Sequence, residues 1–119
     1  MSEESPLGRI EVSPRAIASI ASDAVLSCYG VVGMSTAQLR DGIAEVLQVR
    51  HYYRGVNVRS EEGHIVVDLY VVVEFGTRIS EVARNVMESV KFRLEQALGM
   101  PVAEINVHVQ GLRVSNQND

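Results

Sequence analysis

The sequence contains a single cysteine, Cys28, so the chain cannot close a disulfide within itself. Such sparse cysteine usage is typical of proteins of a reducing cytoplasm. No apolar run approaches the roughly 20 residues that cross a bilayer, and residues 1–8 are acidic rather than basic and apolar. We therefore expect a cytoplasmic protein with no membrane span of its own.

A surplus of basic residues is also missing. The 119 residues carry a formal net charge of −4, whereas domains that bind nucleic acid are usually basic. The hydrophobic fraction of 46% is ordinary for a globular domain with one core. Neither a repeat nor a linker divides the chain. We predict one domain over 8–113, with flexible tails over 1–7 and 114–119.

Signatures of catalysis and metal binding are equally scarce. The histidines His51, His64 and His108 lie far apart, and none has a metal-binding spacing such as H-x-x-x-H. The chain has no G-x-S-x-G motif, and Cys28 falls on an apolar helical stripe, where a cysteine is usually a small buried hydrophobe. We predict no catalytic residues, no cofactor and no metal.

The second half of the chain has the clearest periodicity. Apolar and polar residues alternate over 64–75, as in a strand with one face in a core. Over 79–98 the apolar residues recur every three or four positions, as on a buried helix face, and Gly99 with Pro101 ends the pattern. Residues 103–110 alternate again, so they predict a second strand of the same kind.

The first half supplies the other elements. Residues 8–12 alternate as a short strand, and Ser13 with Pro14 is a strong start for a helix that ends near Tyr29. Residues 41–47 predict a short extra helix. Residues 56–59 alternate, and the turn at 61–63 joins them to the strand over 64–75.

This order of elements, strand, helix, strand, strand, helix and strand, predicts a two-layer α+β sandwich. A four-stranded, mainly antiparallel sheet carries the two long helices on one face. The other face is half solvated and available to a partner. The candidate partner residues are Arg9, Arg59, Val66, Tyr70, Val72 and His108. Exposed apolar side chains among them favour a contact surface, and edges with few lysines or prolines favour self-association.

A nucleic-acid-binding module is the alternative. Residues 30–33 match the bare G-x-x-G that KH domains place between two helices to clamp a nucleic-acid backbone. Residues 50–54 mix basic and aromatic side chains, which stack on bases in other proteins. The residues of this alternative are Gly30, Gly33, Arg50, Tyr52 and Arg54. The acidic net charge and the lack of a basic residue inside the turn argue against nucleic acid as a partner.

Several segments together resemble the alkaline shock protein family of general and envelope stress response proteins. They are G-R-I-E-V-S-P at 8–14, G-V-V-G-M at 30–34, G-V-N-V at 55–58, V-D-L-Y-V-V-V-E-F-G at 67–76, E-V-A-R-N-V at 81–86 and V-A-E-I-N-V-H-V-Q-G-L at 102–112. The resemblance covers residues 8–113. Ser80 stands where members commonly have proline, which changes a helix cap. The chain lacks long charged extensions, so it resembles the short housekeeping type.

The resemblance implies a cytoplasmic bacterial protein of cell-envelope homeostasis without known catalytic residues. Some members are held at the membrane by a separate anchor protein, and others are encoded beside enzymes of fatty-acid metabolism. We therefore expect a non-catalytic scaffold that binds itself and either a membrane-anchored protein or a lipid-metabolism enzyme. Its association with the membrane would then be through that partner. Regulation of fatty-acid-synthesis enzymes is a further alternative that rests on the same resemblance.

Overall fold

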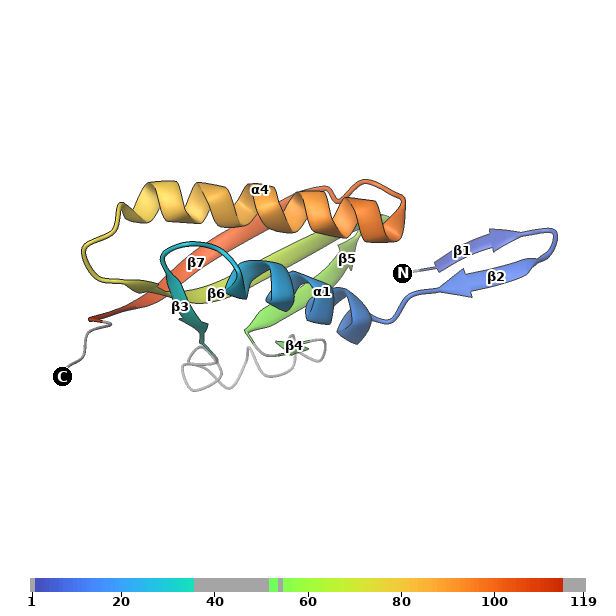
Figure 1. Cartoon of the computed structure of the whole chain (residues 1–119). Coiled ribbons are helices and arrows are strands. Elements are labelled where there is room, and N and C mark those ends of the chain that lie inside the picture. The colour runs from blue at the N-terminus through green and yellow to red at the C-terminus, as the bar shows by residue number, and fades with distance from the viewer. Residues whose placement is uncertain (1, 36–51, 54, 115–119) are drawn as a thin grey trace.

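The computed structural model describes residues 2–35, 52–53 and 55–114 (Figure 1). The strands are β1 (Ser2–Ser5), β2 (Gly8–Glu11), β3 (Val31–Met34), β4 (Tyr52–Tyr53), β5 (Val56–Glu61), β6 (His64–Glu74) and β7 (Glu104–Arg113), and the helices are α1 (Pro14–Leu26) and α4 (Ile79–Leu98). Within the described residues, β3 to β7 form one five-stranded sheet, and β1 and β2 form a separate hairpin.

Strand β6 is the centre of the sheet because three other strands pair with it. Along one edge, β5 pairs antiparallel with the first half of β6 and β3 with the second half. Along the other edge, β7 runs parallel to β6 for nearly its whole length. The β5–β6 connection is a two-residue turn of Glu62 and Gly63, both with positive φ, which matches the twist of antiparallel strands.

Both helices cover the same face of this sheet, and the core lies between the two layers (Figure 1). The alternate residues of β6 that point toward the helices are fully buried. Helix α1 contributes small side chains, which let it approach closely, whereas α4 contributes a stripe spaced by four. The core members of these three elements are Ile65, Val67, Leu69, Val71 and Val73 from β6, Ile17, Ala18, Ala21, Ala24 and Val25 from α1, and Val82, Val86, Val90 and Leu94 from α4.

The helix boundaries follow the expected capping residues. The Ser13 side chain accepts a hydrogen bond from the Ala16 N–H at 3.1 Å, and Pro14 occupies the first turn of α1. Gly99 has the left-handed conformation that ends α4, with φ of 72°. The predicted start of α1 and the predicted end of α4 are confirmed. Helix α1 ends at Leu26, three residues before the predicted end near Tyr29.

The predicted class is confirmed: an α+β protein with two long helices on one face of a mainly antiparallel sheet. The strand content of that sheet differs from the prediction. Strand β2, predicted to be its first strand, pairs instead with β1, and β1 occupies part of the predicted N-terminal tail. Strands β3 and β4 complete the main sheet in its place. The short helix predicted over 41–47 and the tail after 114 lie outside the described residues.

Candidate interaction surface

The face of the sheet turned away from the helices is called here the outer face. Strand alternation and register place on it every second residue of β5, β6 and β7. A buried carboxylate, Asp68, lies at its centre, in register with Asn57 of β5 and Asn106 of β7. The remaining members are Arg59 from β5, Val66, Tyr70 and Val72 from β6, His108 and Gly111 from β7, and Gly33 from β3.

Asp68 organises the side chains around it by hydrogen bonding. The Arg59 guanidinium donates from Nε to Oδ2 at 2.9 Å, and the Asn106 amide donates from Nδ2 to Oδ1 at 3.1 Å. The Nε2 atom of His108 lies 3.3 Å from the same Oδ1. Arg59 also pairs with Glu61 at the end of its strand. Three neighbouring strands are therefore tied together by one carboxylate.

The charge of Asp68 is stabilised despite its burial. Burial by itself would raise the pKa of this carboxyl group, because it penalises the charged form. Hydrogen bonds from Arg59, Asn106 and His108, together with the positive charge of Arg59, outweigh burial and lower the pKa of Asp68 below its usual value. The carboxylate is consequently ionised at neutral pH and acts as a fixed anchor for its donors.

An aromatic pair and the apolar side chain of Val72 lie next to this anchor. The rings of Tyr70 and His108 stack with centroids 4.6 Å apart and an interplanar angle of 13°. One step further along β6, Val72 is in register with Gly33 on one side and Gly111 on the other. Neither glycine has a side chain to cover Val72, which is partly exposed at this point of the outer face.

Within the described residues, one buried polar atom of the outer face has no hydrogen-bond partner. This atom is Oδ1 of Asn57, a residue that is only 7% exposed. Such an unsatisfied acceptor costs on the order of 1–3 kcal/mol relative to a hydrogen-bonded one. Because this atom is buried, it is not itself an accessible contact point on the outer face.

Four of the six predicted partner residues lie together here, namely Arg59, Tyr70, Val72 and His108. Arg9 does not, because β2 belongs to the separate hairpin, where Arg9 pairs with Glu11. Val66 is on the predicted face but is only 3% exposed, since Arg59 and Glu104 flank it in register. Its predicted exposure as part of a contact surface is therefore corrected.

The structural context of the nucleic-acid alternative also differs from expectation. Residues 31–34 form β3, paired with β6, so the G-x-x-G segment is not a loop between two helices. Gly30 is buried, with a φ of 90°, and an added Cβ would lie 2.7 Å from a methyl group of Val82. This close packing against α4 explains the glycine. The structure does not describe the remaining residues of this alternative, which are Arg50, Arg54 and the side chain of Tyr52.

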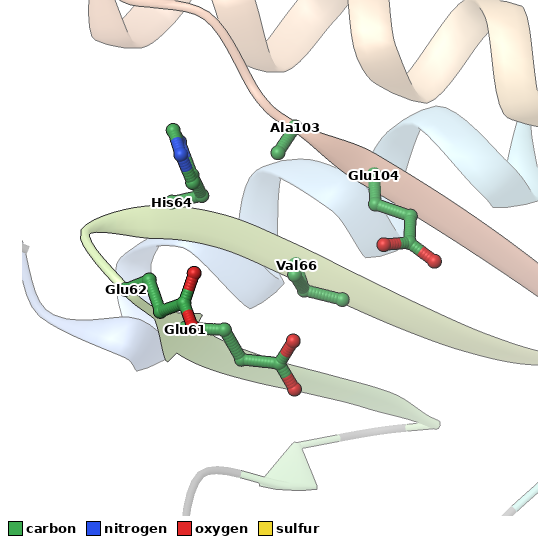
Figure 2. A pocket seen from close by; sticks show the side chains of 6 residues that line it. All are labelled: Glu61, Glu62, His64, Val66, Ala103 and Glu104. Atoms are coloured by element: carbon green, nitrogen blue, oxygen red, sulfur yellow. The ribbon is translucent and has the colours of Figure 1, made fainter.

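A shallow pocket of about 490 Å³ lies at the turn end of the sheet (Figure 2). It is lined by Glu61 and Glu62 at the β5–β6 turn, His64 and Val66 of β6, and Ala103 and Glu104 at the start of β7. Figure 2 shows these side chains spread around the opening rather than converging on one point. Within the described residues, no group of three or more His, Cys, Asp or Glu side chains could hold a metal ion.

Sequence reasoning missed the residues that hold the outer face together. Asn57 and Asp68 lie buried at its centre, and Asn106 beside them is partly buried. The signal was present in the pattern, because alternation placed all three on one side. Their mutual contact required the β5–β6 and β6–β7 registers, which no local pattern specifies.

Comparison with known proteins finds a matching family model and several similar bacterial proteins. The model of the Asp23 family, described by its cell envelope-related function, matches residues 2–114. The uncharacterized protein YloU of Bacillus subtilis (strain 168) is 44% identical over 110 residues, which cover 92% of each chain. The uncharacterized protein Spy1614 of Streptococcus pyogenes serotype M6 is 39% identical over 112 residues, which cover 93% of each chain. The uncharacterized protein YqhY of Bacillus subtilis is 32% identical over 111 residues.

Proposed function

The chain belongs to the Asp23 family of cell envelope-related proteins, and from this we propose that it is a non-catalytic interaction protein that binds itself and a membrane-linked or lipid-metabolism partner. None of the described helices is long and apolar enough to cross a membrane. In this proposal a partner therefore links the protein to the envelope. The family name refers to a protein and is unrelated to residue 23 of this chain.

The observation that carries the proposal is the partly exposed Val72, which lies between two glycines and next to the stacked rings of Tyr70 and His108. The Asp68 network orders these rings before any partner arrives, so little side-chain freedom is lost on binding. Aromatic and arginine side chains are common anchors of protein interfaces, and Arg59 lies on the same face. A partner would place an apolar side chain over Val72, beside Gly33 and Gly111.

Two variants test this surface by opposite means. Val72→Glu puts a charge on the outer face, and Gly111→Val adds a branched side chain next to Val72. The nearest atom to a Cβ at Gly111 is a Val72 methyl group at 4.0 Å, so an added Cβ meets no clash there. The outer face should lose its partner in both variants, as measured by recovery of partner proteins with the tagged chain from solubilised membranes.

Phe92→Glu is the matched control, because Phe92 is 62% exposed on α4, on the other layer of the molecule. This control should retain the partner. Thermal unfolding of all variants separates loss of binding from loss of folding. Retention of the partner by Val72→Glu and Gly111→Val, with both variants folded, would show that the outer face is not the binding surface. Recovery of RNA in place of a protein would favour the nucleic-acid alternative.

A further inference from the structure

The N-terminal hairpin of β1 and β2 projects from the body of the protein (Figure 1). Beyond their mutual pairing, neither strand makes an extended contact with another described helix or strand. An isolated two-stranded hairpin is at best marginally stable in water. Two large apolar side chains of the hairpin face solvent: Leu7 is fully exposed and Ile10 is 63% exposed. The hairpin is therefore built as an arm that needs a surface to pack on.

Uncovered apolar side chains also gather at the opposite end of the protein. We call this group the end patch; its members are Tyr29, Phe75, Ile79, Leu112 and Val114, between 39% and 80% exposed. Two backbone hydrogen bonds bring their segments together. The Phe75 N–H donates to the Arg113 carbonyl at 2.7 Å, and the Glu74 N–H donates to the Gly30 carbonyl at 2.8 Å. An apolar group of this kind usually marks a contact surface.

The arm cannot reach the end patch of its own chain. In Figure 1 the hairpin lies at one end of the molecule, and the ends of β6 and β7 lie at the other. The longest dimension of the protein is 59 Å. Among the described residues, nothing covers the arm or the end patch, and the two lie too far apart to cover each other.

We propose that the N-terminal hairpin of one copy docks on the end patch of a second copy. This proposal rests on the self-association in the proposed function. The two surfaces of this contact are different, so the contact is heterologous. Each added copy leaves one free arm and one free patch, and the assembly grows head to tail unless the rotation between copies closes a ring.

Complementation between two full-length variants tests this geometry. Leu7→Asp with Ile10→Glu disables the arm, and Phe75→Glu with Val114→Glu disables the end patch. All four side chains are largely exposed in the isolated chain, so neither double variant removes core packing. Sedimentation velocity should show concentration-dependent oligomers for the unaltered chain and a monomer for each variant alone. The equimolar mixture should form a discrete one-to-one dimer, because one intact arm meets one intact patch.

Phe92→Glu serves again as the control and should associate like the unaltered chain. Variants that still form the full oligomer, or a mixture that stays monomeric, would overturn the docking proposal while self-association stands. A monomeric unaltered chain at all concentrations would instead contradict self-association itself. Circular dichroism of each variant establishes that a monomer is a folded one.

Discussion

At the scale of single residues, Asp68 is the group on which the outer face depends. It is nearly fully buried, yet it is charged, because three side chains from two neighbouring strands direct donors at its oxygens. A buried charge is tolerated only when it is paired and hydrogen bonded in this way. Through His108 the same carboxylate fixes the ring of Tyr70, so the outer face is ordered by a residue that is not itself accessible.

The lowered pKa of Asp68 predicts a specific pH dependence for Asp68→Asn. The pKa of the folded protein lies below the unfolded value of about 3.9. The ionised form thus adds stability that is complete above about pH 4 and is lost as the pH falls through the folded-state pKa. At neutral pH the variant should be less stable by about 1–3 kcal/mol. Urea unfolding of both proteins should show this difference shrinking toward about pH 3; a difference independent of pH would contradict the assignment.

Glu95 of α4 makes a backbone contact in addition to the ion pair that its position in the sequence indicates. Its spacing from Lys91 indicates a surface ion pair on α4, and the two groups do lie 3.8 Å apart. Its Oε2 atom also accepts a hydrogen bond from the buried backbone N–H of Val102 at 2.9 Å, which ties the end of α4 to the segment before β7.

We expect Glu95→Ala to lower the free energy of unfolding by about 1–3 kcal/mol, because it leaves the Val102 N–H without a partner. Lys91→Ala should cost less than about 1 kcal/mol, since it removes only an exposed ion pair. Chemical denaturation of the two variants side by side makes this comparison. Equal effects would mean that the ion pair, and not the backbone contact, accounts for the role of Glu95.

At the scale of elements, the sequence predicted those helices and strands whose apolar residues recur with a regular spacing. Helices α1 and α4 and strands β5, β6 and β7 each have one apolar face, and their approximate positions followed from it. Strand β3 was missed because residues 30–34 are apolar and glycine-rich without alternation. The place of β2 was missed for a different reason. Its alternation predicted a strand correctly, but pairing with β1 rather than with the main sheet is decided by tertiary contacts.

The turn between α1 and β3 carries a prediction for Gly30. Gly30→Ala must strain a left-handed backbone position and push against Val82 of α4, with an expected cost of about 1–3 kcal/mol. Gly33→Ala is the matched control within the same motif. A Cβ at Gly33 meets nothing within 4 Å, so the change should be nearly neutral for stability. Thermal unfolding of both variants suffices, and an equally stable Gly30→Ala would refute the close packing of this turn on α4.

At the scale of the whole molecule, the protein has two distinct surfaces with separate roles in this account. We propose that the outer face binds a different protein and that the arm with the end patch joins copies of the chain. Sequence reasoning found Arg59, Tyr70, Val72 and His108 because alternation alone separates the two faces of a strand. It could not find the end patch, whose members come from four segments that only the fold brings to one end.

Separate surfaces predict separable losses of function. The arm and patch variants should lose self-association but still recover the partner, whereas Val72→Glu should lose the partner but still self-associate. Sedimentation velocity and partner recovery on the same set of proteins measure the two properties. Loss of both properties in every variant would mean that partner binding requires the assembly.

Recovery of partners with the tagged full-length chain at native expression tests the central claim most directly. Solubilised membranes are included, nuclease is omitted, and proteins and RNA are both quantified. The account predicts a membrane protein or a lipid-metabolism enzyme in near-equal amount, present with Phe92→Glu and absent with Val72→Glu. Recovery of no protein in such an amount, or equal recovery with folded Val72→Glu, would contradict a partner-binding role for the outer face.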